Sequence, residues 1–425
     1  MIVATRLFDS LTEAEEARAR RVDSVLPALA LAAEEADRIA EFPMAHVTTL
    51  AEAGLMGLVV PERFGGLGGG LRDLVGATFA MGTACPSTAL SYFFHCSSAS
   101  RGLLALEALE AGLFDADERG TVAAFAERVL ELMGRDRVWM ANFASESVKS
   151  SSANILISTT AEPTTLAGEK GWVLNGVKSF GCATGVAGRY LVTASLGGGV
   201  TADSLAVFIV DPKSPGVRER SRWDAIGMRA TATHGIVLND VFVPAIDSLA
   251  IPGAFVRMMQ MSRGSFVGSQ VAGTAVYLGA ACAVYDWTMK HLTSTTFSDT
   301  GAPIGSAPFQ QQLIGEMRMH LDTATLWLRR QVDLETSEPP ILPKPDVVRQ
   351  WRLAKGTVVD SAFAVGVCAM KACGTSNTGN SGVVARGLRD LSMGLVQAFP
   401  AEKGRLEAAS LLVSGAESTQ FGAKA

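Results

Sequence analysis

The side chains that could carry chemistry by themselves are few and scattered. Five histidines occur, none at the spacing that metal ligands take: His46, His95, His234, His291 and His320. Six cysteines occur without any C-x-x-C pair: Cys85, Cys96, Cys182, Cys282, Cys368 and Cys373. This usage predicts reduced, mostly buried thiols in a cytoplasmic protein, with no metal site.

Short motifs are more informative than single residues. They are the turn-dense Pro61–Gly68, the Trp172–Phe180 stretch, Gly227–Thr231 followed by Asn239–Pro244, and the pair Arg389-Asp390. Each has a simple structural explanation. Asn175-Gly176 is typical of a type I′ hairpin turn, and Gly65-Gly66 permit positive φ.

In this order the motifs resemble those of the acyl-CoA dehydrogenases. The similar patterns are P-E-x-x-G-G-x-G, L-N-G-x-K, G-M-R-x-T with D-V-F-V-P, and R-D, and they cover roughly residues 10–415. The resemblance implies the acyl-CoA dehydrogenase fold, an α+β multidomain architecture. It has an N-terminal helical domain, a central antiparallel β-domain and a C-terminal four-helix-type bundle.

The resemblance also implies a flavin cofactor, FAD, with FMN or reduced flavin from a partner reductase as alternatives. The segment Ala141–Ser147 resembles the family segment that holds the flavin ring through backbone and hydroxyl groups. The cofactor-binding residues it implies there are Asn142, Ala144, Ser145 and, further on, Ser151. Phe180 matches the aromatic residue stacked on the ring, and Cys182 matches a threonine near the flavin N5.

The flavin pyrophosphate site departs from the family pattern. Members bind the pyrophosphate with an arginine followed by Phe-Gly from a neighbouring subunit. Here Ser294 and Ser298 flank Phe297 in their place, so a charge-assisted contact is lost. Lys371, near Gly374, is the candidate replacement. FAD is therefore expected to bind more weakly, or to arrive already reduced.

The catalytic glutamate of the family is also missing. Its usual position matches Ala398, its alternative position matches Ser262, and Glu402 lies beyond Pro400. The segment Pro86–His95 is similar to a P-S-x-A…H segment in flavin monooxygenases of this fold. His95 is the predicted catalytic acid, because imidazole titrates near neutral pH. The alternative is a histidine held by a neighbouring backbone carbonyl.

The predicted elements place these motifs in three domains. Helix formers dominate from Leu11 onward, short β-rich runs begin near Arg137, and helical patterns return from Ala254. We expect an N-terminal helical domain at 1–128, a β-domain contacting flavin at 129–247, and a helical bundle for oligomerisation at 248–425.

Composition and charge argue against nucleic acid and a membrane as partners. Hydrophobic residues make up 48% and charged residues 19%, so the chain is globular, and a net charge of −5 without a basic run argues against nucleic acid. No apolar run reaches the roughly 20 residues of a membrane span. The apolar stretch 271–285 would be exposed in a monomer, and the resemblance also implies a homodimer or homotetramer.

Three functions stay open. The first is a flavin-dependent oxidoreductase acting on an acyl thioester, of CoA or a carrier protein, or on a related small molecule, without the usual glutamate. The second is a two-component monooxygenase that uses reduced flavin. The third is a non-catalytic partner subunit of a heteromeric dehydrogenase. An electron-transfer protein or a flavin reductase is the expected protein partner.

Overall fold

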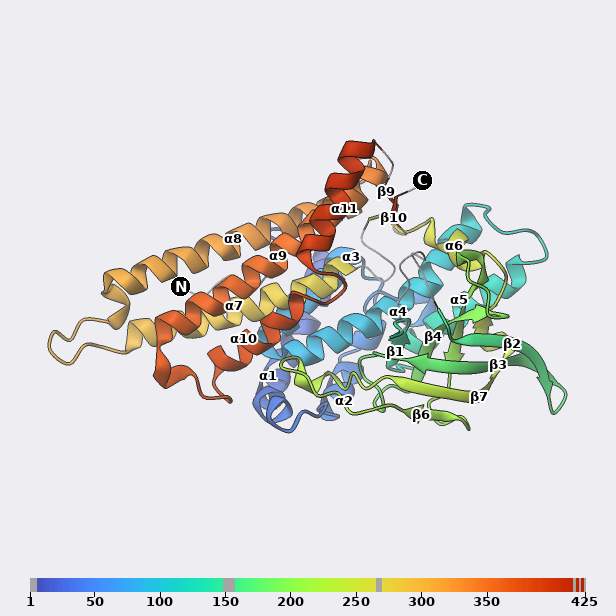
Figure 1. Ribbon diagram of the computed structural model, residues 1–425, viewed down its shortest axis with the longest axis horizontal. Coiled ribbons are helices and arrows are strands. Elements are labelled where there is room, and N and C mark those ends of the chain that lie inside the picture. The colour runs from blue at the N-terminus through green and yellow to red at the C-terminus, as the bar shows by residue number, and fades with distance from the viewer. Residues whose placement is uncertain (1–5, 148–156, 265–269, 416–417, 420–421, 424–425) are drawn as a thin grey trace.

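The computed structural model describes residues 6–147, 157–264, 270–415, 418–419 and 422–423. A β-sheet lies at one end of the molecule, a bundle of long helices at the other, and the N-terminal helices join them (Figure 1). The fold class expected from the sequence is confirmed. Helix α5 runs past residue 128, the expected boundary, to Gly134.

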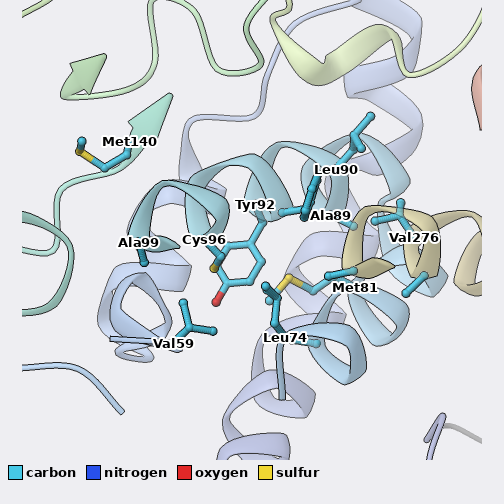
Figure 2. Close-up of a cluster of buried hydrophobic side chains, with 14 of the residues drawn as sticks. Val59, Leu74, Met81, Ala89, Leu90, Tyr92, Cys96, Ala99, Met140 and Val276 are labelled. Carbon is cyan, nitrogen blue, oxygen red and sulfur yellow. The ribbon is translucent and has the colours of Figure 1, made fainter. Parts of the chain in front are cut away.

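Five α-helices form the N-terminal domain. They are α1 (Glu13–Ile39), α2 (Ala45–Glu52), α3 (Leu71–Ala84), α4 (Pro86–Glu110) and α5 (Arg119–Gly134). The helix α1 begins at a capping box, in which Thr12 and Glu15 each bond the backbone of the other. Helix α4 runs through the centre of this domain, and its Tyr92 is packed between Val59, Leu74 and Cys96 (Figure 2).

The described part of the β-domain forms one eight-stranded sheet. Its strands are β1 (Met140–Phe143), β2 (Thr160–Leu166), β3 (Glu169–Lys178), β4 (Arg189–Leu196), β5 (Leu205–Val210), β6 (Val217–Glu219), β7 (Ile236–Pro244) and β8 (Ser248–Leu249). The order is β6-β7-β3-β2-β4-β5-β8, mostly antiparallel, with both β1 and β2 parallel to β4. A separate two-stranded ribbon joins β9 (Ser418–Thr419) to β10 (Gly422–Ala423).

The prediction of a hairpin turn at Asn175-Gly176 is wrong. Strand β3 continues through both residues, with a register shift against β7 between Leu174 and Gly176. The turn lies instead at Ala167 and Gly168, which both have positive φ. The Asn175 side chain has another use: it pairs with Asp240 on β7 through two hydrogen bonds of 2.8 and 3.0 Å.

The C-terminal domain is a bundle of long helices. Its α-helices are α6 (Ala254–Met259), α7 (Gln270–Ser294), α8 (Pro308–Thr336), α9 (Lys344–Cys373), α10 (Val383–Gly394) and α11 (Ala401–Ser414). Within the described residues, α9 alone is long and apolar enough to cross a membrane, and 61% of its most apolar window is buried inside the molecule. It packs against α7, α8, α10 and α11, as the core helix of a bundle does.

The apolar stretch 271–285 does not need a partner subunit. Helix α7 packs against α3, α9 and α10 of the same chain, and nearly all residues of the stretch are buried there. The expectation that this stretch would be exposed in a monomer is therefore wrong. The neighbouring helices of its own chain already cover it.

Two of the motifs meet where the three domains join. A Cβ on Gly227 would come within 2.0 Å of the Arg389 carbonyl oxygen, so only glycine allows this approach. Asp390 accepts a hydrogen bond from the Met228 amide at 2.6 Å, and Arg389 pairs with Asp37 of α1. The motifs therefore fix the β-domain against both helical domains.

Candidate functional site

The residues predicted to hold a flavin ring do come together in two adjacent segments. One follows β1 and contains Ala144 and Ser145; the other follows β3 and contains Phe180 and Cys182. The Ser179 amide donates to the Ser145 carbonyl at 2.9 Å, which ties the segments side by side. We call these four residues the β-domain platform. Asn142 lies just before it, half-buried in β1.

A buried ion pair supports the platform from beneath. Glu146 accepts a hydrogen bond from the Lys178 ammonium at 2.6 Å, and both side chains are at most 1% exposed. Ser158 and Thr159 also donate to the carboxylate through their amides and hydroxyls. Burial alone would raise the pKa of Glu146, but these hydrogen bonds lower it to about 2, so the carboxylate stays charged.

Hydroxyl groups continue from the platform to helix α4. The Thr233 hydroxyl donates to the Cys182 sulfur at 3.1 Å, and it lies 2.7 Å from the Thr231 hydroxyl. The Ser91 hydroxyl of α4 reaches the Thr231 carbonyl at 3.4 Å. Burial raises the pKa of the Cys182 thiol to about 11, so this thiol keeps its proton near neutral pH.

The platform presents an uncovered aromatic ring. Phe180 is 54% exposed, and its ring meets the edge of Trp223 at a centroid distance of 5.9 Å. The Trp223 indole donates to the Met228 carbonyl at 3.0 Å, which holds the second ring in place. An exposed, anchored pair of aromatic rings is suited to packing against a flat ligand.

The environment of His95 does not fit a proton donor to a ligand. Its Nε2 lies 2.9 Å from the Met56 carbonyl, and its Nδ1 accepts from the Met140 amide at 2.9 Å. The side chain is fully buried. Burial lowers the pKa of His95 to about 4, although the bond to Met56 opposes this shift. Both nitrogens are therefore committed to the backbone, which matches the structural alternative.

The loop at the family's usual base position contains no carboxylate. It joins α10 to α11, and Ala398 adopts a positive φ of 65° within it. The fully buried Lys355 of α9 donates to the Gly394 carbonyl at 2.9 Å and to the Phe399 carbonyl. The Glu402 side chain is 82% exposed. The loop is thus held from inside by a lysine.

At the alternative position the structure shows a cavity of about 470 Å³. Ser262 lines it together with Glu107 of α4 and Glu335 of α8. Glu335 is buried and accepts a hydrogen bond from Gln331 at 2.7 Å. Burial raises the pKa of Glu107. Two carboxylates from helices distant in sequence therefore line the cavity at the family's alternative base position, which Ser262 occupies in this chain.

The residues predicted for the pyrophosphate lie elsewhere. Phe297 is in the loop between α7 and α8, while Lys371 and Gly374 are at the end of α9, and all three are exposed. These segments lie at the end of the bundle opposite the β-domain (Figure 1). One chain does not bring them to its own platform. Ser151 lies outside the described residues.

Comparison with protein families decides the assignment. Acyl-CoA dehydrogenase models match at residues 12–107 for the N-terminal domain, 143–241 for the middle domain and 271–399 for the C-terminal domain. The chain belongs to the acyl-CoA dehydrogenase family. It is accordingly an oxidoreductase of the flavoenzyme type, as the sequence motifs predicted.

Relatives within the family differ in activity. YdbM, a Bacillus subtilis (strain 168) protein classed with the acyl-CoA dehydrogenases, is 27% identical over 85% of this chain and 88% of its own. The L-evernosamine nitrososynthase of Micromonospora sp. is 28% identical over 67% of this chain and 63% of its own. The structure of KijD3 with FMN and a dTDP-linked amino sugar has a TM-score of 0.78 at 24% identity, covering 97% of both chains.

For a member of this family, sequence reasoning missed several site residues. Glu146 and Lys178 lie in the two segments predicted to hold the flavin. One acidic and one basic residue in neighbouring segments is a signal that could have predicted their ion pair. Glu107 and Glu335 carry no signal, because nothing in their local sequence shows that α4 and α8 meet at one cavity. Lys355 is likewise indistinguishable from a solvated helix lysine.

Proposed function

We propose that this protein is a flavin-dependent monooxygenase that takes reduced flavin from a separate reductase and oxygenates a small molecule. The observation that carries the proposal is the loop Gly394–Pro400. At the position of the family's α-proton base it has Ala398, and Lys355 fixes its backbone. A dehydrogenase that removes an α-proton requires a carboxylate or another base beside the substrate, and this loop offers none. A monooxygenase has no such requirement.

The platform has the groups that a flavin ring requires. Phe180 and Trp223 offer an aromatic face. The protonated Cys182 thiol follows two residues after Phe180, buried against the Thr233 hydroxyl, and Ser145 lies on the neighbouring segment. Reduced flavin supplies two electrons for O2, so that the substrate gains one oxygen atom and the other leaves as water. The buried Glu146–Lys178 pair keeps the platform rigid while the ligand binds and leaves.

The pyrophosphate region favours a flavin that is exchanged. Ser294 and Ser298 replace the family's arginine and glycine, and both side chains are exposed. Without a guanidinium the protein gives up a charge-assisted contact to FAD. FMN, or reduced FAD held mainly through its ring, fits this site better, and the nitrososynthase relative supports an oxygenating branch.

We also infer a homodimer or homotetramer of cytoplasmic location. Phe297, Lys371 and Gly374 can meet a platform only if a second copy supplies it. Helix α8 supports this arrangement with large apolar side chains on its outer face: Phe309 is 59% exposed, Met319 56% and Leu326 67%. An exposed apolar stripe of this kind marks a protein interface.

The first test is the flavin content and oxygen uptake of the purified protein. We expect a nearly colourless protein, and oxygen uptake when a reductase, NADH and FMN are added. A candidate amine or other small molecule should raise product formation and lower peroxide release. The proposal fails if the protein retains stoichiometric oxidised FAD that acyl-CoA thioesters bleach anaerobically.

A second candidate is an acyl-thioester dehydrogenase with a displaced base. The cavity beside Ser262 favours it, because Glu107 has a raised pKa and Glu335 is buried. A desolvated carboxylate with a raised pKa suits α-proton removal. Acyl-CoA-dependent dye reduction that Glu335→Gln or Glu107→Gln abolishes would establish this function. Exposed Glu402→Gln is the matched control and should change nothing.

A further inference from the structure

Helix α4 carries an arginine whose charge is left without a partner. Arg101 is only 4% exposed. Its Nη1 donates to the Ser100 hydroxyl at 3.4 Å, and its Nε has no acceptor. Among the described residues no carboxylate lies within ion-pair distance of it, and burial, the one influence on its pKa, lowers that pKa to about 9. The guanidinium is therefore still charged at neutral pH.

A second buried arginine, Arg352, differs from Arg101 because it has a carboxylate partner. The Arg352 side chain is 5% exposed, and its Nη1 lies 3.1 Å from the Glu407 carboxylate. Among the described residues Arg101 has no such carboxylate; its guanidinium meets the Ser100 hydroxyl and, at 5.7 Å from its carbon, the Phe255 ring. An unpaired buried charge costs several kcal/mol. A buried, unpaired arginine is explained when a bound anionic ligand supplies its counter-charge.

Arg101 lies next to the cavity through its contact with Ser100, although Arg101 is not itself a lining residue. Ser91, Phe94, Ser98 and Arg101 follow one another at intervals of three or four residues, so they lie along one face of α4. Ser91 reaches the Thr231 carbonyl beside the platform, about 15 Å along the helix from Arg101. Ser100, which the guanidinium contacts, lines the cavity of about 470 Å³.

We propose that Arg101 binds an anionic group of the substrate, a carboxylate or a phosphate, and thereby sets its distance from the platform. This rests on the proposed function, in which the platform holds the flavin. The planar guanidinium can bind either group through two parallel hydrogen bonds. The three cavity carboxylates do not compensate Arg101. Glu338 pairs with Arg263, Glu335 is bonded to Gln331, and Glu107 makes no ion pair with Arg101 among the described residues.

The test compares thermal unfolding of wild type, Arg101→Met and Arg101→Lys in sodium phosphate, sodium acetate and sodium chloride at equal ionic strength. Wild type should be stabilised by phosphate or by acetate over chloride. A kosmotropic salt such as phosphate also stabilises folded proteins without a binding site. The response that counts is therefore the part that depends on Arg101, and the salt that gives it identifies which of the two groups the substrate carries. Arg101→Met should lose this response and bind the anion about 10- to 100-fold more weakly, and Arg101→Lys should keep part of it.

The same experiment separates a ligand role from a structural role. In chloride, Arg101→Met should be as stable as wild type or more stable, because it removes an unpaired charge. Arg352→Met, the control, should be destabilised, because Glu407 loses its close partner and is left with the exposed Lys403, 3.9 Å away. The proposal is overturned if Arg101→Met melts well below wild type in chloride, if it keeps the anion response, or if wild type shows none. Reduced FMN binding, measured separately, shows whether the proposed function stands regardless.

Discussion

Two fully buried lysines support the two halves of the site, and they are compensated differently. Lys178 lies under the β-domain platform and pairs with the Glu146 carboxylate. Lys355 lies under the Gly394–Pro400 loop. Among the described residues it has no carboxylate within ion-pair distance and contacts backbone carbonyls and the Phe399 ring, at 5.3 Å. The platform thus keeps a complete ion pair. The loop, where the family has a base, keeps a cation and no carboxylate.

The different compensation of Lys178 and Lys355 distinguishes charges that the fold requires from charges that the reaction requires. The platform motifs keep their charges because the surrounding backbone depends on them. The loop could lose its carboxylate because Lys355 fixes its backbone without one. A member of the family can therefore keep the cofactor surface and change the chemistry by altering a single loop.

The largest expected effect comes from breaking the buried pair. Glu146→Gln leaves the Lys178 ammonium without a counter-charge, which should cost about 3–5 kcal/mol of unfolding free energy. Because the pKa of Glu146 is about 2 when folded and near 4.3 when unfolded, its contribution is present above pH 4.3 and is lost as the pH falls toward 2. Urea unfolding checks this.

Asp322→Asn is the control for that variant. It breaks the Arg318–Asp322 pair, in which both side chains are 51% exposed. Such exposed pairs contribute less than about 1 kcal/mol. Equal losses of unfolding free energy in Glu146→Gln and Asp322→Asn would show that the buried platform pair contributes no more than an exposed pair.

Lys355→Met should show a pH dependence of the same sign as Glu146→Gln, but in an alkaline window. Burial lowers the pKa of Lys355 to about 8, against about 10.4 in the unfolded chain. Between these values the unfolded chain binds more protons, so wild type should gain up to roughly 3 kcal/mol relative to the variant as the pH rises from 8 to 10.4. Unfolding at pH 7.5, 9 and 10 measures it. A difference that stays flat would contradict the account of the loop.

Asp390, at the domain junction, should produce a smaller change. Burial raises the pKa of Asp390 to about 6, above its unfolded value near 3.9. The folded protein then binds more protons between pH 4 and 6. Wild type should therefore gain about 2–3 kcal/mol over Asp390→Asn as the pH falls through this window. Calorimetry at pH 4.5 and 7.5 tests the sign, which a salt-bridged aspartate would reverse.

The smallest expected effect is that of His95→Gln on turnover. A positioned acid–base group contributes 10²–10⁴-fold, whereas a histidine committed to Met56 and Met140 contributes only through packing. Oxygen uptake with reduced FMN should change by less than about tenfold. A hundredfold loss in a folded variant would restore His95 as the catalytic acid.

Much of the fold could be predicted from the sequence, because periodicity and motif order are local signals. The helix–sheet–helix order and the segments around Ala144 and Phe180 follow from them. The turn at Asn175-Gly176 could not be assigned correctly, because pairing with β7 overrides the local preference. The covering of α7 within one chain depends on α3, which lies about two hundred residues earlier in the sequence.

The site was less predictable than the fold. Burial and pairing decide what a charged residue does, and both are tertiary properties. Nothing in the sequence distinguishes Arg101 from a solvated helix arginine, or shows that Glu107 and Glu335 line one cavity. His95 was singled out by the resemblance of the segment Pro86–His95, by the missing glutamate and by the titration range of imidazole. Its role is fixed instead by two backbone groups far away in the chain.

Anaerobic titration of the purified protein with reduced and with oxidised FMN tests the central claim most directly. The account predicts that reduced FMN binds at least about tenfold more tightly, a difference of roughly 1.4 kcal/mol. It also predicts that admitting oxygen then releases oxidised FMN. Tighter binding of oxidised flavin, with reduction by an acyl-CoA thioester, would contradict it and identify a dehydrogenase.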